Sequence, residues 1–178
     1  PAPAAPPPPT APPVRPARVV LPANKSPAVA IRLLFHAGSA DDPPDLPGLT
    51  ALTANLMAEG GTEHDTAFEL KERLFPWAAS IRVEVDAEMT VFVAQVPADR
   101  LDAFLPLLVD VVARPRYEAS ELERLRRDAR DDLTRRLRAN DDENLGKAAL
   151  DVLMYGRHPY GHFVGGSVAG LDRVKMAD

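Results

Sequence analysis

Residues 48–62 have the sequence GLTALTANLMAEGGT, which is the pattern of a buried amphipathic helix. Apolar residues recur there at steps of three and four and so share one helix face: Leu49, Leu52, Leu56 and Met57. Asp45 is a suitable N-cap, and Pro47 suits an early helical position, where its missing N–H costs little. Gly60-Gly61 can supply the left-handed residue that ends the helix.

The composition indicates one globular domain with a substantial core. The chain has 178 residues, of which 46% are apolar, and its net charge of −5 argues against nucleic acid as a partner. The sequence contains no cysteine, which excludes disulfides and thiolate metal sites. No apolar run approaches the roughly 20 residues that a membrane span needs, so none is expected.

The N-terminal segment differs sharply from the rest. Residues 1–16 are nearly all proline and alanine, which favours an extended, disordered tether ahead of a domain over 17–178. A ligand for a proline-binding module is the alternative. The first residue is proline and no signal peptide is present, which suggests a trimmed form or part of a longer chain. Tethers of this kind suit bacterial envelope proteins, so we expect a periplasmic or cell-envelope location, with the cytoplasm as the alternative.

Short strands and a helix are predicted on either side of residues 48–62. Residues 18–21 and 28–36 are rich in β-branched and apolar side chains and indicate strands, with His36 as a polar strand end. Thr66 and Glu69 form a capping box at the start of a helix over 66–75. Alternation over 80–86 and 89–96 then predicts an antiparallel hairpin, with Trp77 packed beneath it.

The second half is predicted to be helical. An apolar helix is predicted over 98–113, and Pro106 inside it should either kink this helix or mark its true start. A long charged helix follows over 118–140. Acid-first pairs four residues apart support that helix, which presents a solvated or a partner-docking face: Glu123/Arg127, Asp131/Arg135 and Asp132/Arg136. An amphipathic helix over 144–155 uses the apolar residues Leu145, Ala148, Ala149, Val152 and Leu153.

Two loops complete a family pattern. The loop 37–43, AGSADDP, precedes the first helix, and His158-Pro159-Tyr160-Gly161 follows the last. With residues 48–62, and in this order over about 18–178, they resemble the insulinase/pitrilysin metallopeptidases, which include the mitochondrial processing peptidases. The resemblance implies an α+β domain with helices packed on one face of a largely antiparallel sheet, one half of a clamshell. Relatives continue with a helix and further strands, so the sheet is expected to be incomplete at its C-terminal end.

The zinc motif of that family is degenerate in this chain. Active members carry His-x-x-Glu-His on the first helix, and in register those residues fall on Ala51, Ala54 and Asn55. Alanine offers zinc no lone pair, and an asparagine amide is a poor zinc ligand. The family's third ligand, a glutamate, matches the region of Asp131-Asp132. We therefore expect no catalytic residue and no metal ligand in this chain, and zinc in its partner.

The resemblance implies a non-catalytic subunit or half of a zinc metallopeptidase, in a heterodimer with an active partner. Paired halves of this family close around an unfolded peptide, and one wall of such a chamber needs no metal. A set of residues is predicted to contribute to this wall: Asn55, Glu59, His158, Tyr160 and His162.

Two alternatives remain open. An active peptidase could use a relocated site built from some of the residues Glu59, His64, Asp131, Asp132, His158 and His162. His158 and His162 alone are a weak metal pair, because proline and glycine between them disfavour the helix that would align them. The chain could instead be a purely structural or binding homologue without any proteolytic partner.

Overall fold

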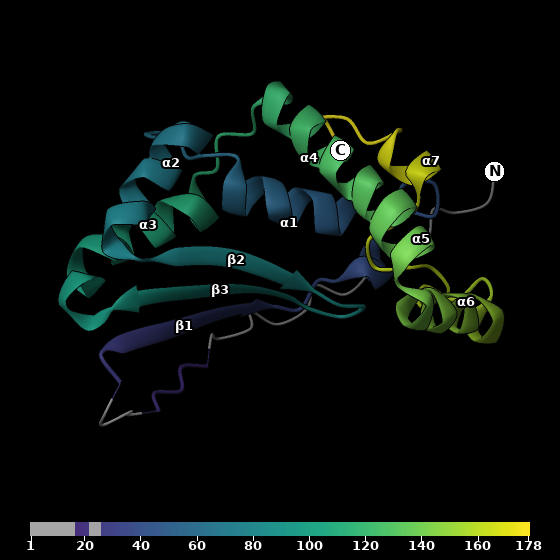
Figure 1. The fold of residues 1–178 in the computed structure, drawn as a ribbon, viewed down its shortest axis with the longest axis horizontal. Helices are drawn as coiled ribbons and strands as arrows, with labels where there is room; N and C mark the ends of the chain where they lie inside the picture. Colours follow the sequence, from purple (N-terminus) through teal and green to yellow (C-terminus); the bar gives the residue numbers. More distant parts are fainter. Residues whose placement is uncertain (1–16, 22–25) are drawn as a thin grey trace, which may run out of the picture.

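The computed structural model describes residues 17–21 and 26–178; the predicted tether over 1–16 and residues 22–25 lie outside them. Three strands form one antiparallel sheet in the order β1-β3-β2, namely β1 (Ala28–Phe35), β2 (Ser80–Val85) and β3 (Thr90–Pro97) (Figure 1). In its register, Ala94 of the central strand lies opposite both Ile31 and Ile81. The predicted hairpin is therefore confirmed.

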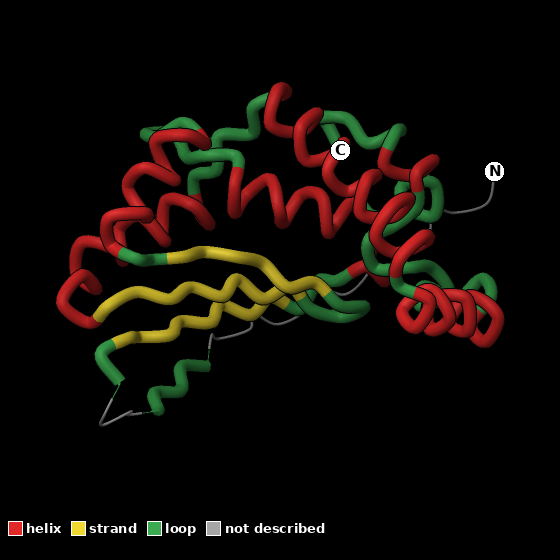
Figure 2. Tube along the Cα trace, in the orientation of Figure 1, coloured by secondary structure: helices red, strands yellow, loops and turns green. Residues whose placement is uncertain are grey.

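Three helices cover one face of this sheet, α1 (Leu49–Glu59), α2 (Ala67–Leu74) and α3 (Leu101–Ala113) (Figures 1 and 2). The core between sheet and helices contains Ala94, Val96, Phe104 and Leu108, and Trp77 packs against it as predicted. This arrangement confirms the predicted α+β class, with helices on one face of an antiparallel sheet.

A second core lies farther along α1. It joins α1 to α4 (Ala119–Asp131) and α7 (Val168–Leu171) through the buried side chains of Leu52, Leu56, Leu122, Leu125 and Leu171. Between α4 and α7 the chain forms a π-helical segment over Asp132–Leu137, then α5 (Arg138–Asn140) and α6 (Asp142–Tyr155). Within the described ranges, no helix has the length and apolar character needed to cross a bilayer.

Several local predictions are wrong in detail. Residues 18–21 form no strand. The predicted helix over 118–140 is present from Ala119 to Asn140, but it contains a π-helical segment, where the Thr134 hydroxyl donates to the Arg130 carbonyl oxygen at 2.7 Å. Such a bond from a side chain to its own helix backbone disturbs the regular ladder. α3 starts at Leu101 and runs through Pro106. Glu123 pairs with Arg126 one turn away, not with Arg127.

The start of α1 is capped by a residue that precedes it by several positions. The N-cap is Gly48, not Asp45, and it has a left-handed backbone with φ of +100°. The Asp42 carboxylate accepts from the Gly48 N–H at 2.6 Å and from the Thr50 N–H at 2.8 Å. These are N–H groups that the first helical turn leaves free, so Asp42 performs the capping function that the sequence assigned to Asp45.

Replacing Asp42 by alanine is expected to destabilise the protein by about 1–2 kcal/mol, the usual cost of losing a helix cap. The Gly48 and Thr50 N–H groups both lose the carboxylate that accepts from them. The Thr50 hydroxyl also loses its 2.7 Å bond to the same carboxylate. The exposed Asp45 is the matched control, and Asp45→Ala is expected to change stability by less than about 0.5 kcal/mol. Urea unfolding of the two variants measures both values, and equal losses would contradict the assignment.

Candidate functional site

A cleft of about 710 Å³ lies between α1, the C-terminal part of α4 with the π-helical segment, α6 and the loop after α6. The α1 helix contributes Ala51, Asn55 and Glu59, which are spaced one turn apart and so face the same side. Asp132 and His162 face this cleft from two other parts of the chain. The cleft is therefore assembled from segments far apart in the sequence.

The three residues that the resemblance aligns with the zinc motif, Ala51, Ala54 and Asn55, do not share one environment. Ala51 and Asn55 line the cleft and are partly buried, whereas Ala54 is buried with 4% of its surface exposed and does not line it. The Asn55 side-chain amide donates to the carbonyl oxygen of Ala51 at 2.8 Å. One polar group of Asn55 is thus directed at its own helix rather than across the cleft.

These side chains do not fit a zinc ion. Zinc in proteins takes imidazole, thiolate or carboxylate donors, commonly three or four together. Over 17–21 and 26–178, no three His, Asp or Glu side chains gather in a way that could hold a metal. Asp132 is the residue of the Asp131-Asp132 pair that faces the cleft, and it pairs with Arg136 at 3.4 Å.

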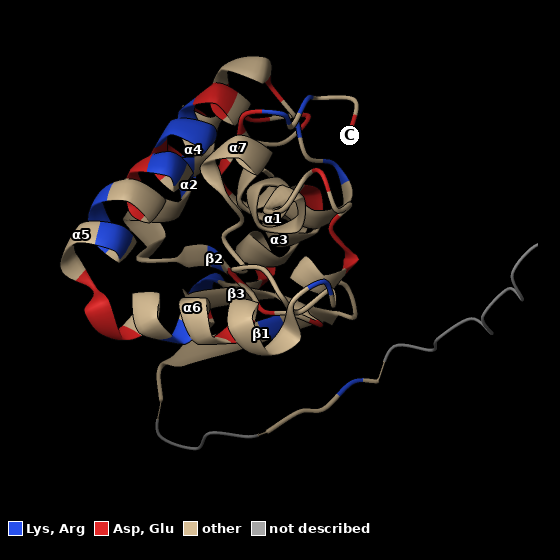
Figure 3. Cartoon of the chain, turned by 90° about the vertical axis from the view of Figure 1, so that its right-hand side faces the viewer, with Lys and Arg blue, Asp and Glu red and all other residues tan. Residues whose placement is uncertain are grey.

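An arginine joins the two helices on the α1 side of the cleft. The Arg124 guanidinium on α4 binds Glu121 at 2.8 Å, Asp128 at 3.0 Å and Glu59 of α1 at 3.2 Å. Burial disfavours its charge, but the hydrogen bonds to Glu121 and Glu59 outweigh that effect and raise the pKa of Arg124. Acidic and basic residues alternate along α4 and α5 (Figure 3), and Arg124 links this charged surface to the cleft.

The α6 helix forms the outer wall with its polar side inward. Its cleft-lining residues share one face: Asn144, Lys147, Ala148, Asp151 and Tyr155. The predicted helix is present, and none of its residues is buried. Leu153 is 82% exposed and Met154 is 66% exposed. Helical periodicity identifies such a face but not the side on which the rest of the protein lies.

The loop after α6 carries an aromatic cluster. Tyr155, His158 and Tyr160 contact one another, and the centroids of the His158 and Tyr160 rings are 4.8 Å apart in an edge-to-face arrangement. Tyr160 lines the cleft, whereas His158 lies behind it, where its Nδ1 accepts from the Tyr160 N–H at 3.2 Å. The Tyr160 hydroxyl donates to Glu88 in the β2–β3 turn, and this bond raises the pKa of Tyr160.

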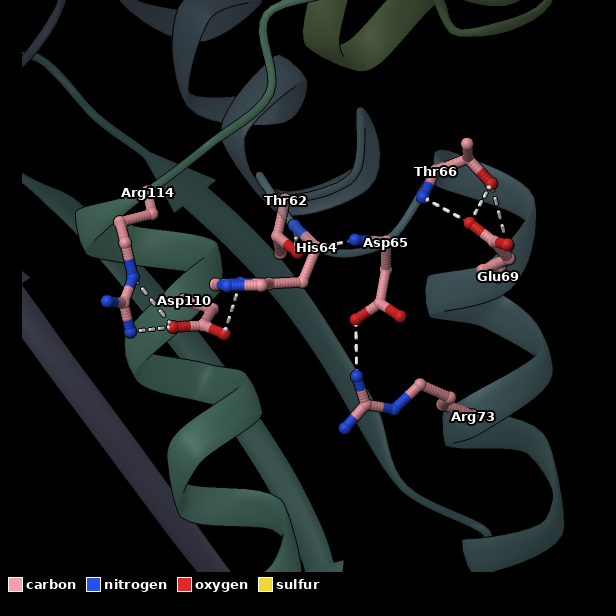
Figure 4. Close-up of polar contacts among 8 residues, drawn as sticks. All are labelled: Thr62, His64, Asp65, Thr66, Glu69, Arg73, Asp110 and Arg114. Atoms are coloured by element: carbon pink, nitrogen blue, oxygen red, sulfur yellow. Dashed lines mark hydrogen bonds and ion pairs between the residues drawn. The ribbon is translucent and has the colours of Figure 1, made fainter.

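The structure separates the residues considered for a relocated site. Glu59, Asp132 and His162 share the cleft, but Asp131 pairs with Arg135 at 3.7 Å outside its lining. His64 lies near α3, where its Nδ1 is 3.2 Å from Asp110 (Figure 4). Sequence reasoning missed Lys147 and Asp151, which line the cleft from α6, and Arg124, which binds the cleft-lining Glu59 from α4. These positions follow from packing alone.

The His64 loop is a structural junction between α1, α2 and α3 (Figure 4). The Thr62 hydroxyl accepts from the His64 and Asp65 N–H groups at 3.2 and 3.1 Å, and Asp65 pairs with Arg73 of α2. The predicted capping box of Thr66 and Glu69 is present beside it. These contacts account for the polar groups of the loop without any ligand.

Acid is expected to weaken this junction through Asp110. The hydrogen bond from Arg114, with His64 nearby, lowers the pKa of Asp110 below its usual value. A carboxylate with a lowered folded-state pKa stabilises the fold above the unfolded-state pKa and loses that contribution as the pH falls through the folded-state pKa. Asp110→Asn is therefore expected to be less stable than the parent at about pH 7, and the gap is expected to narrow in urea unfolding as the pH falls below the usual aspartate pKa of about 3.9. A gap that is independent of pH would contradict this.

Residues 18–160 match the model of the family described as insulinase, peptidase family M16. A protein of Pseudomonas aeruginosa named coenzyme PQQ synthesis protein F is 32% identical over 138 residues, which is 75% of this chain but 17% of that protein. The chain thus spans a small part of this curated relative.

Solved structures share the fold. A structure described as a peptidase M16 inactive domain from Pseudomonas fluorescens matches with a TM-score of 0.75 and 24% identity, over 87% of this chain and 37% of that one. Pitrilysin matches with a TM-score of 0.71 and 24% identity, over 83% of this chain and 16% of that one. A protease from Helicobacter pylori matches with a TM-score of 0.71 and 17% identity, over 86% of this chain and 37% of that one.

Proposed function

Because the chain belongs to the insulinase family, peptidase family M16, we propose that residues 17–178 form the non-catalytic wall of a peptide-binding chamber. A partner subunit or half with an intact zinc motif supplies the other wall and the hydrolysis. The observation that carries this proposal is the cleft itself, which is retained while its α1 face presents Ala51 and Asn55 in place of metal ligands.

The cleft suits an extended peptide. β2 pairs only with β3 in the described part of the sheet, so its other edge is unpaired over Ser80–Val85, and Val85 helps to line the cleft. Just beyond β2, the Asp86 and Ala87 carbonyl oxygens already accept from Ser39 and Ala40. An extended peptide can add to such an edge through main-chain hydrogen bonds, which need no particular side-chain sequence. Holding the peptide in this way raises its effective concentration at the partner's metal.

The size of the chain is consistent with a shared chamber. It corresponds to 17% of the Pseudomonas aeruginosa relative and 37% of the Pseudomonas fluorescens structure. The remainder of a protein of that length has room for a second wall.

Reconstitution tests the proposal. The isolated chain is expected to bind no stoichiometric zinc and to cleave no quenched fluorescent peptide, as measured by metal analysis and fluorescence. Mixing it with a family member that carries His-x-x-Glu-His is expected to raise that member's kcat/KM for the peptide. The matched control is a variant with Ala51→Trp, which fills the cleft and should abolish the gain. Zinc-dependent hydrolysis by the isolated chain, or no gain with any motif-bearing member from the same source, would overturn the proposal.

A further inference from the structure

The outer wall of the cleft is weakly attached to the rest of the protein. Leu125 and Gly166 are buried, but no residue between them is. We call residues 138–165 the cleft arm; it contains α5, α6 and the loop that follows (Figure 1). Burial of apolar side chains is the main source of attachment between elements, and the cleft arm lacks it.

Both ends of the cleft arm have irregular backbone. At one end is the π-helical segment Asp132–Leu137, where the Thr134 hydroxyl donates a hydrogen bond to the Arg130 carbonyl oxygen. Short π-helical turns of this kind often accompany functional sites. At the other end is Gly165, followed by Gly166, whose backbone has a left-handed φ of +80° and packs closely against Pro47 and Gly48. The π-helical segment and Gly165, on the arm side of this fixed point, are positions where the chain can bend without unfolding α6.

One side-chain hydrogen bond holds the cleft arm between these ends. Among the described residues, and apart from the local bond from the Gly166 N–H to the Phe163 carbonyl oxygen, the hydrogen bond from the Tyr160 hydroxyl to Glu88 is the only one that joins the cleft arm to a residue before α4 or after Gly165. Glu88 itself is on a firmly held turn. The Ser39 N–H donates to the Asp86 carbonyl oxygen and the Ala40 N–H to the Ala87 carbonyl oxygen, both at 2.9 Å.

We infer that Tyr160 and Glu88 form a latch, which fixes the cleft arm against the β2–β3 turn and thereby sets the width of the cleft. Opening the latch lets α6 move away from α1 about the π-helical segment and Gly165. Tyr160 and Glu88 are positioning residues in this scheme. The latch itself does not depend on the proposed function; its use in admitting a peptide rests on that function.

Distance measurements between two spin labels test the latch in the absence of peptide. The sequence has no cysteine, so Leu153→Cys on α6 and Phe68→Cys on α2, 82% and 71% exposed, can be labelled uniquely. Tyr160→Phe and Glu88→Ala are each expected to shift the population toward longer distances by about twofold to fivefold, the effect of losing an exposed hydrogen bond to a charged group. The double variant is expected to match either single one, and Glu88→Gln, which keeps an acceptor, to lie between.

Tyr155→Phe is the matched control, because it removes a hydroxyl from the same aromatic cluster but leaves the latch, and its distances should equal those of the parent. Unchanged distances in Tyr160→Phe and Glu88→Ala, or an equal shift in Tyr155→Phe, would overturn the latch. Adding a fluorescent unfolded peptide separates the two proposals. If the latch variants lengthen the distances but no form binds the peptide, the proposed chamber fails and the latch stands.

Discussion

Replacing Ala51 and Asn55 together by histidine is expected to create a zinc site in this chain. The two positions are one helical turn apart on α1 and both face the cleft, which is the spacing of a zinc-binding histidine pair, and Asp132 faces the same cleft. With free zinc at about 100 times the Kd, binding would stabilise the variant by about 2.7 kcal/mol. That corresponds to a rise in Tm of roughly 5–11 °C for a chain of this size. Thermal unfolding with and without zinc, and chelator competition, measure the effect.

The third ligand of that engineered site can be identified by a matched pair of variants. Adding Asp132→Ala to the double-histidine form is expected to weaken zinc binding, because it removes the carboxylate that faces the cleft. Adding Asp131→Ala should leave binding unchanged, since Asp131 lies outside the cleft lining and pairs with Arg135. An equal effect of the two changes, or no zinc binding by the double-histidine form, would show that the cleft does not have the geometry described.

Replacing Gly166 by alanine is expected to destabilise the protein by about 3–5 kcal/mol, the combined cost of a strained backbone and an overpacked contact. Gly166 has a φ of +80°, and an added Cβ would lie 2.5 Å from the Cα of Gly48. Neither backbone can move easily, because Gly48 is the N-cap of α1. Chemical unfolding measures the loss.

Gly146 is the control for that change. It lies inside α6, and a Cβ added there meets no atom within 4 Å. Gly146→Ala is therefore expected to stabilise α6 by about 0.5–1 kcal/mol, because alanine has the higher helix propensity. A similar loss of stability in both variants would indicate that the contact between Gly166 and Gly48 is not a rigid one.

The elements whose cause is local could be predicted from the sequence. The capping box of Thr66 and Glu69 and the alternation over 80–96 act between residues that are neighbours in the chain, and both appear in the structure. The resemblance over 18–178 indicated the α+β class, which the sheet and its covering helices confirm.

The elements that depend on distant residues could not be predicted. Asp42, and not Asp45, caps α1, because the loop after β1 folds back onto the start of the helix. Arg124 binds Glu59 across 65 sequence positions. The apolar face of α6 points outward because the rest of the protein lies on the other side of the helix. The sequence of α6 alone does not determine on which side that is.

The sequence by itself determined the helix α1, the hairpin and the lack of metal donors at residues 51, 54 and 55, because each of these depends on residue type and local spacing. Tertiary structure alone decided which of those positions face the cleft, that Asp132 rather than Asp131 lies opposite them, and that the outer wall is held by Tyr160 and Glu88. The physical reason is that a cleft is made by the packing of segments far apart in the chain. Helical periodicity shows which residues share a helix face, but not which other element packs against that face.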